Sequence, residues 1–254
     1  MTTDSDRTDT IDLGVPGTGT SGFSVTSPAK PALSESRLAD VLEGVLRLRE
    51  HWVERDRGFH TLGLSLYKDG QEAGGDRLDV AESNARLEEA FGPALGDLKA
   101  LLSRELGAEV EWGDGLPLPG FHVFEAEALR PGQAAGNSHF DIQYIWGGFG
   151  ERVLDAVSVT VPIQVPAAGT SLEYWEVDFA EYERLFREGE VDDLAGAERR
   201  FPMQTVPYEP GRACLMRGLP LHRIGTTPAV EPADRRITLQ GHAVLLGERW
   251  IAYW

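Results

Sequence analysis

The chain has 254 residues, 41% of them hydrophobic, and a formal net charge of −17. This length allows one main domain with a large core, whereas the acidic balance makes nucleic acid and anionic membranes poor partners. No stretch approaches the roughly 18 consecutive apolar residues of a membrane span. The single cysteine, Cys214, excludes an internal disulfide. Because the N-terminus also lacks the features of a secretory signal, we expect a cytoplasmic protein.

The first part of the chain predicts a tail followed by helices. Residues 1–30 are rich in Thr, Ser, Gly, Asp and Pro without periodicity, which predicts a disordered tail. Residues 31–108 are expected to be mainly helical, with helical spacing of apolar residues over 38–52 and again over 80–106. Gly92-Pro93 is expected to break or kink the second helix. A short apolar run at 62–67 predicts a strand.

The second part of the chain, residues 109–254, has the texture of a β-sheet protein. Short β-rich runs separated by Gly and Pro fall at 109–112, 121–126, 140–145, 157–165, 171–177, 213–216 and 237–246. Their close spacing favours a sandwich or barrel over βαβ units. We therefore expect a mainly β fold with flanking helices, a double-stranded β-helix (jelly roll, cupin-like), with residues 31–254 forming a single domain. The charged insertion at 179–200 is either a lid or a surface decoration.

One constellation of residues carries chemistry. His139 and Asp141 are two residues apart, so that on a strand they would point the same way. His222 follows far downstream, after several predicted strands that can return the chain to the same place. Two imidazoles and one carboxylate are the ligand set that holds ferrous iron on one face and leaves other positions open. The alternative is a hydrogen-bonded His139–Asp141 pair without metal.

A second group of residues lies on the predicted strand that begins at Arg236. Arg236 and Thr238 share one face of this strand, whereas Arg235 points away. Arginine binds carboxylates through paired, charge-assisted hydrogen bonds, and a threonine hydroxyl can donate to the same group. The pattern indicates a site for a dicarboxylate co-substrate. The alternative is that Arg236 forms a surface salt bridge.

The order of these motifs resembles that of the iron(II)/2-oxoglutarate-dependent oxygenase superfamily. The matching segments are NSHFDIQYIW, GRACLMRGLPLHRIG and RRITLQGHAV, and the resemblance covers roughly residues 119 to 246. It implies that His139, Asp141 and His222 bind Fe(II), and that Arg236 with Thr238 holds the far carboxylate of 2-oxoglutarate. The helical first part and the segment PGFHVF are similar to the small branch of amino-acid hydroxylases and halogenases.

The resemblance also implies a reaction. A member of this superfamily uses O₂ to hydroxylate a C–H bond while 2-oxoglutarate is decarboxylated to succinate. Halogenases of the branch have a small residue where Asp141 stands, so Asp141 favours hydroxylation, or a related oxidation such as desaturation. The expected substrate is a small molecule, an amino acid or a metabolite derived from one. The rival hypothesis is a cupin-like metal-binding isomerase or ligand-binding protein without O₂ chemistry.

Four residues are candidates for substrate contacts, each with a structural alternative. Glu125 could bind a substrate ammonium group if buried, or lie on the surface. Asn137 could contact substrate at the mouth of the site, or cap a turn. Trp146 and Trp175 could line the pocket, or belong to the core. The oligomeric state stays open, a homodimer included.

Overall fold

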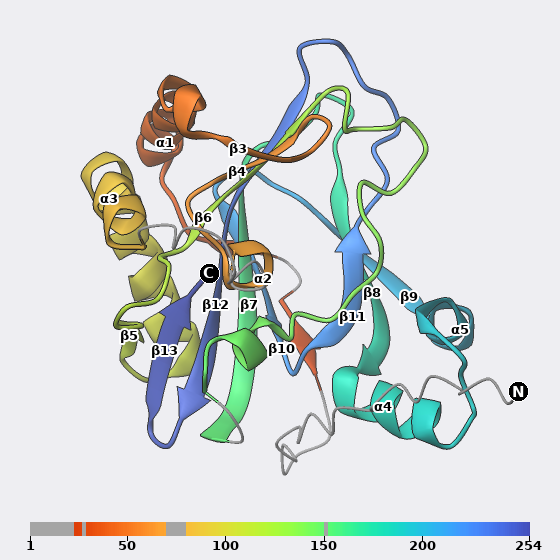
Figure 1. Cartoon of the computed structure of the whole chain (residues 1–254). Helices are drawn as coiled ribbons and strands as arrows, with labels where there is room; N and C mark the ends of the chain where they lie inside the picture. Colours follow the sequence, from red (N-terminus) through yellow and green to blue (C-terminus); the bar gives the residue numbers. More distant parts are fainter. Residues whose placement is uncertain (1–22, 27–28, 70–79, 150–151) are drawn as a thin grey trace, which may run out of the picture.

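The computed structural model describes residues 23–26, 29–69, 80–149 and 152–254, and shows two β-sheets with helices around them (Figure 1). The larger sheet has ten strands and the smaller sheet has three. The main path of the larger sheet runs through β1 (Ser24–Val25), β10 (Arg212–Arg217), β7 (Val153–Gln164), β12 (Arg235–Leu246), β6 (Gly120–Glu125), β4 (Phe59–Leu62) and β3 (Val53–Asp56). Off this path, β2 (Lys30–Pro31) pairs with β10, and β13 (Arg249–Tyr253) pairs with β12 and β5 (Val110–Trp112). The smaller sheet has the order β11 (Pro220–Ile224), β8 (Ser171–Asp178), β9 (Met203–Pro207).

The two faces of the larger sheet differ in chemistry. On β12, Ile237, Leu239 and Ala243 belong to the main hydrophobic core, whose helices α1 (Glu35–Arg47) and α3 (Val80–Leu106) lie against this face. Arg236 and His242 alternate with them and line a cavity on the opposite side. Since strand side chains alternate between faces, one face of the sheet packs against the helices and the other faces the smaller sheet. This two-sheet arrangement confirms the predicted jelly-roll fold.

The two long helices were largely predicted from the sequence. Ser34 caps α1, because its side chain accepts a hydrogen bond from the Arg37 backbone N–H. Helix α3 spans Val80–Leu106 without interruption, so the expected break at Gly92-Pro93 is wrong. Gly92 has no Cβ to clash with the Pro93 ring, which removes the usual reason for leaving the helical region before a proline. Pro93 is itself exposed, so its ring faces away from the core.

Three other local predictions need correction. Residues 62–67 do not form one strand, because β4 ends at Leu62 and the short helix α2 (Leu66–Asp69) follows. Residues 140–145 are not a strand either: after an isolated bridge at His139 the chain enters the 3₁₀ helix η2 (Gln143–Trp146). The tail predicted for residues 1–30 is wrong for Ser24–Val25, which pair with β10 as β1. Residues 1–22 lie outside the described residues.

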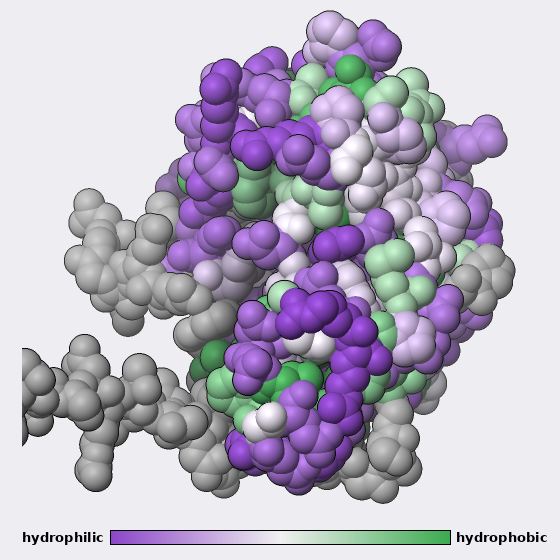
Figure 2. Space-filling model, turned by 90° about the vertical axis from the view of Figure 1, so that its right-hand side faces the viewer, coloured by the Kyte–Doolittle hydropathy of each residue, from purple (hydrophilic) through white to green (hydrophobic). Residues whose placement is uncertain are grey.

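The insertion at 179–200 contains two helices. Asp178 caps α4 (Phe179–Arg187) and Asp193 caps α5 (Leu194–Arg200). A further 3₁₀ turn, η1 (Arg49–His51), follows α1. Figure 2 looks onto the side of the molecule where α4 and α5 lie, and most of that side is hydrophilic. Within the described part of the chain, no helix is long and apolar enough to cross a membrane.

Candidate metal centre and cavity

Two histidines far apart in the sequence face each other across a short antiparallel bridge. The His139 N–H donates to the His222 carbonyl over 2.9 Å, and the His222 N–H donates back to the His139 carbonyl over 3.0 Å. Residues that exchange both hydrogen bonds in this way place their side chains on the same face. The two imidazole rings accordingly lie 4.4 Å apart, centroid to centroid.

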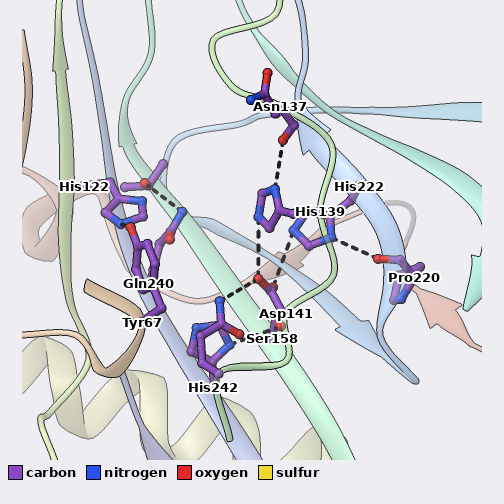
Figure 3. A network of polar contacts seen from close by, with 12 residues as sticks. Tyr67, His122, Asn137, His139, Asp141, Ser158, Pro220, His222, Gln240 and His242 are labelled. Atoms are coloured by element: carbon purple, nitrogen blue, oxygen red, sulfur yellow. Dashed lines mark hydrogen bonds and ion pairs between the residues drawn. The ribbon is translucent and has the colours of Figure 1, made fainter. Parts of the chain in front are cut away.

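The hydrogen bonds of the two rings fix which nitrogen is available to a metal. His139 Nδ1 lies 2.9 Å from the Asn137 carbonyl, and His222 Nδ1 lies 3.0 Å from the Pro220 carbonyl (Figure 3). A carbonyl oxygen only accepts, so each Nδ1 carries the proton and donates. Each Nε2 therefore keeps its lone pair, which is the arrangement that backbone carbonyls impose on metal-binding histidines.

Asp141 completes the group. Its carboxylate oxygens lie 3.6 Å from His139 Nε2 and 3.4 Å from His222 Nε2, and the Gln143 side-chain amide donates to it over 3.0 Å. Burial opposes ionisation of Asp141, but the neighbouring imidazoles and the Ser158 hydroxyl hold its pKa well below the usual range. Burial lowers the pKa of His222 to about 4. At neutral pH the group therefore combines a carboxylate with a neutral His222.

The geometry of these three side chains fits a metal ion. One ligand atom from each of His139, Asp141 and His222 lies within 4.8 Å of the other two. Three protein ligands of this kind leave coordination positions open, which a structural metal site with four protein ligands would not. Nitrogen and oxygen donors in a two-histidine, one-carboxylate set suit ferrous iron. The sequence thus predicted which residues converge, although Asp141 reaches the site from an irregular segment and not from a strand.

Arg236 is a fully buried cation without an anion beside it. Its side chain is 0% exposed, and it forms no ion pair with the described residues; no guanidinium nitrogen has a hydrogen bond of good geometry there, and its polar neighbour is the Tyr208 side chain. The rings of Phe124 and Tyr208 lie 5.3 and 5.2 Å from its guanidinium carbon. Burial lowers the pKa of Arg236, whereas Tyr208 favours the charged form. A buried charge of this kind is costly unless a ligand compensates it.

Arg236 and the three ligand residues line the same cavity. Its volume is about 600 Å³, within the usual range for small-molecule sites. Thr238 lies on the same face of β12 but is fully buried, and the Gln240 amide donates to its hydroxyl over 3.4 Å. Gln240, not Thr238, borders the cavity. Arg235 points elsewhere, as predicted, with its Nε 3.8 Å from Glu125.

Of the candidate substrate contacts whose side chains the structure describes, one borders the cavity. Asn137 lines the cavity. Glu125 does not: its carboxylate faces Arg49 at 2.8 Å and His60 at 3.3 Å instead. Trp175 is 3% exposed and packs in a hydrophobic cluster with residues of both sheets and of the insertion. The side chain of Trp146 lies outside the described part of the structure.

A polar pair lies inside the cavity, and one of its members, Tyr67, was missed by sequence reasoning. The Tyr67 hydroxyl lies 2.8 Å from His122 Nε2, and both residues line the cavity (Figure 3). His122 stands opposite Thr238 in the pairing of β6 with β12. Side chains alternate between faces along β6, so His122 faces the cavity whereas Glu125, three residues on, does not. No signal in the sequence pointed to Tyr67, because its segment was predicted to be a strand.

The fold and the side-chain group together define a double-stranded β-helix with a two-histidine, one-carboxylate centre. No family model matches the chain, and no curated protein is similar to it in sequence. Among solved structures, the chain is similar to an N-substituted L-amino acid dioxygenase from Burkholderia ambifaria AMMD, with a TM-score of 0.53 and 16% identity over 92% of this chain and 86% of that one. A structure of such a dioxygenase from the same organism in complex with α-ketoglutarate gives a TM-score of 0.52 and 13% identity over the same shares. At these identities the similarity establishes a common fold.

Proposed function

We propose that this chain is an iron(II)- and 2-oxoglutarate-dependent oxygenase that hydroxylates a C–H bond of a small molecule. The observation that carries this proposal is the presence, in one cavity, of three metal-ligand side chains and a buried arginine without a counterion. A metal site alone would serve many functions. The unpaired guanidinium adds a requirement for an anionic ligand beside the metal.

Each residue has a role in this proposal. His139, Asp141 and His222 hold Fe(II), and Arg236 binds the far carboxylate of 2-oxoglutarate through paired hydrogen bonds. Thr238 supports the site indirectly, because its hydroxyl accepts a hydrogen bond from the Gln240 side chain that borders the cavity. Bound iron would supply the activation of O₂, coupled to decarboxylation of 2-oxoglutarate to succinate. The described residues would orient the two organic molecules and limit the access of water.

The proposed substrate is an amino acid or a metabolite derived from one. Support comes from the fold shared with a protein named as an N-substituted L-amino acid dioxygenase, and from a cavity large enough for such a molecule beside 2-oxoglutarate. Asn137 is the candidate contact that borders the cavity. Asp141 supports oxygen insertion or desaturation over halogenation, because it occupies the position that a halide would need.

The test is a panel of free and N-substituted amino acids incubated with the protein, Fe(II), 2-oxoglutarate and O₂. Mass spectrometry should find a product with one additional oxygen, formed together with succinate; a loss of two hydrogens would show desaturation instead. An Asp141→Ala variant is the matched control and should form neither product. If the wild-type protein binds iron but consumes no 2-oxoglutarate with any substrate, the cupin-like alternative without O₂ chemistry is favoured.

A further inference from the structure

A carboxylate from the insertion joins the two segments that carry the histidines. Ser138 precedes His139 and Arg223 follows His222, and both side chains reach Glu198 on α5. The Ser138 hydroxyl donates a hydrogen bond to Glu198 Oε1, and Arg223 Nη1 lies 3.6 Å from Glu198 Oε2. We call Glu198, Ser138 and Arg223 the clasp.

Other contacts hold Arg223 and the helix that carries Glu198 in place. The Glu173 carboxylate lies 2.7 Å from Arg223 Nε, and the Trp175 ring lies 5.0 Å from the Arg223 guanidinium carbon. Ala197, the neighbour of Glu198, is fully buried in the cluster that anchors α5. Ser138 is 9% exposed. The Glu198 and Arg223 side chains are 26% and 27% exposed, so the clasp is a part-buried link between α5 and the two segments.

The backbone alone connects these segments weakly. The bridge between His139 and His222 is isolated, and the two bridges further along, Ala134 with Thr226 and Pro131 with Thr227, also lie outside any named strand. Two hydrogen bonds are a small constraint on two segments that must hold their ligand atoms within 4.8 Å of each other. A metal site needs its ligands held to within a fraction of an ångström by the residues around them.

We propose that Glu198 is a positioning residue, which keeps the His139 and His222 segments at the spacing that one metal ion requires. The inference rests on the proposed metal site and gives the 179–200 insertion a role within it. Through Glu198, helix α5 becomes part of the support of the metal centre. Groups that support ligands from outside typically change metal affinity by 10- to 100-fold when removed.

The test measures Co²⁺ binding to the metal-free full-length protein by calorimetry, which does not depend on turnover. Glu198→Ala should weaken Co²⁺ binding about tenfold. Glu198→Gln should lie between this variant and the wild type, since its carbonyl can still accept from Ser138 but carries no charge toward Arg223. Ser138→Ala should also weaken binding, which checks the other end of the clasp.

Glu190→Ala is the matched control. Glu190 lies in the same insertion and its carboxylate lies 2.6 Å from Arg200 of α5, but it does not contact the histidine segments. It should bind Co²⁺ as the wild type does, with melting temperatures of the metal-free proteins measured alongside. Wild-type affinity in Glu198→Ala, or equal weakening in Glu190→Ala, would overturn the inference. Failure of the wild-type protein itself to bind Co²⁺ would overturn the proposed metal site instead.

Discussion

At the scale of single residues, Arg236 distinguishes this cavity from an ordinary metal pocket. An arginine with no exposed surface normally faces a carboxylate, because burial of an unpaired charge is unfavourable. Arg236 faces two aromatic rings and the cavity. Without a ligand, the buried charge of Arg236 therefore lowers the free energy of unfolding. An anion that binds beside Arg236 would raise it again.

This view predicts the effect of Arg236→Met on the ligand-free protein. Methionine fills similar space without a charge, so the free energy of unfolding should stay within about 1 kcal/mol of the wild type or increase. Urea unfolding of both metal-free proteins measures the difference. A loss of several kcal/mol would show that Arg236 has a structural partner, and would contradict its role as a ligand-binding group.

The residues that could be predicted from the sequence are those whose chemistry depends on their type. His139, Asp141, His222 and Arg236 stood out because metal and carboxylate binding need these side chains at suitable spacings. Gln143, Tyr67 and Glu198 act through contacts that depend on tertiary packing, and common polar residues at such positions give no signal in one sequence. Glu125 stayed open between the cavity and the surface, because the alternation along β6 could not show which face meets the cavity.

At the scale of elements, periodicity predicted the long helices well and short strands less well. Helix α3 matches the predicted bounds because its apolar face recurs over 27 residues. The strand predicted at 140–145 is absent, because the apolar residues there are buried by a 3₁₀ helix instead. Tyr144 of this helix lies in the same hydrophobic cluster as Phe140. Strands β3 and β11 were missed because each is short and carries several polar residues.

The two helices that pack against the larger sheet allow a matched pair of glycine substitutions. Gly96 in α3 is exposed, and a Cβ added there would meet nothing within 4 Å. Gly96→Ala should therefore raise the free energy of unfolding by about 1 kcal/mol, because alanine is the better helix former. Thermal or urea unfolding measures it.

The control for this prediction is Gly44→Ala in α1. A Cβ at Gly44 would lie 2.7 Å from Phe91 Cε1, so the same substitution should lower stability by separating α1 from α3. If Gly44→Ala is as stabilising as Gly96→Ala, the two helices do not pack as closely as the structure indicates.

At the scale of the whole molecule, the fold class could be predicted because β-rich runs at short spacing, following a helical first part, are compatible with few architectures. The sequence could not predict which strands pair with each other. In the smaller sheet, β11 pairs with β8 along one side, whereas its contact with His139 is a single isolated bridge. The candidate metal centre lies between β11 and the irregular segment that carries His139 and Asp141.

Buried histidines predict how the stability of the metal-free protein depends on pH. Burial lowers the pKa of His222 to about 4, and also lowers the pKa of His122 and His242. In the unfolded chain imidazoles protonate near pH 6.5, so from there down to about pH 4 the unfolded state binds more protons. The free energy of unfolding should therefore fall as the pH is lowered through this window, with His222 alone contributing on the order of 3 kcal/mol.

Urea unfolding at several pH values between 7.5 and 4.5, with a chelator present, checks this prediction. A His222→Gln variant should show a shallower fall because it lacks one of the groups that titrate. Stability that stays constant from pH 7.5 to 5 would show that the imidazoles are accessible to protons in the folded protein.

The most direct test of the central claim is an anaerobic titration of 2-oxoglutarate into protein loaded with Fe(II). We predict one bound iron and one bound 2-oxoglutarate per chain, with a weak visible charge-transfer absorption from their direct contact. In Arg236→Met, iron binding should persist while 2-oxoglutarate binding weakens about a hundredfold or more, as expected when a buried charged partner is removed. Iron-loaded wild-type protein without this absorption, or equal 2-oxoglutarate affinity in the two proteins, would contradict the account.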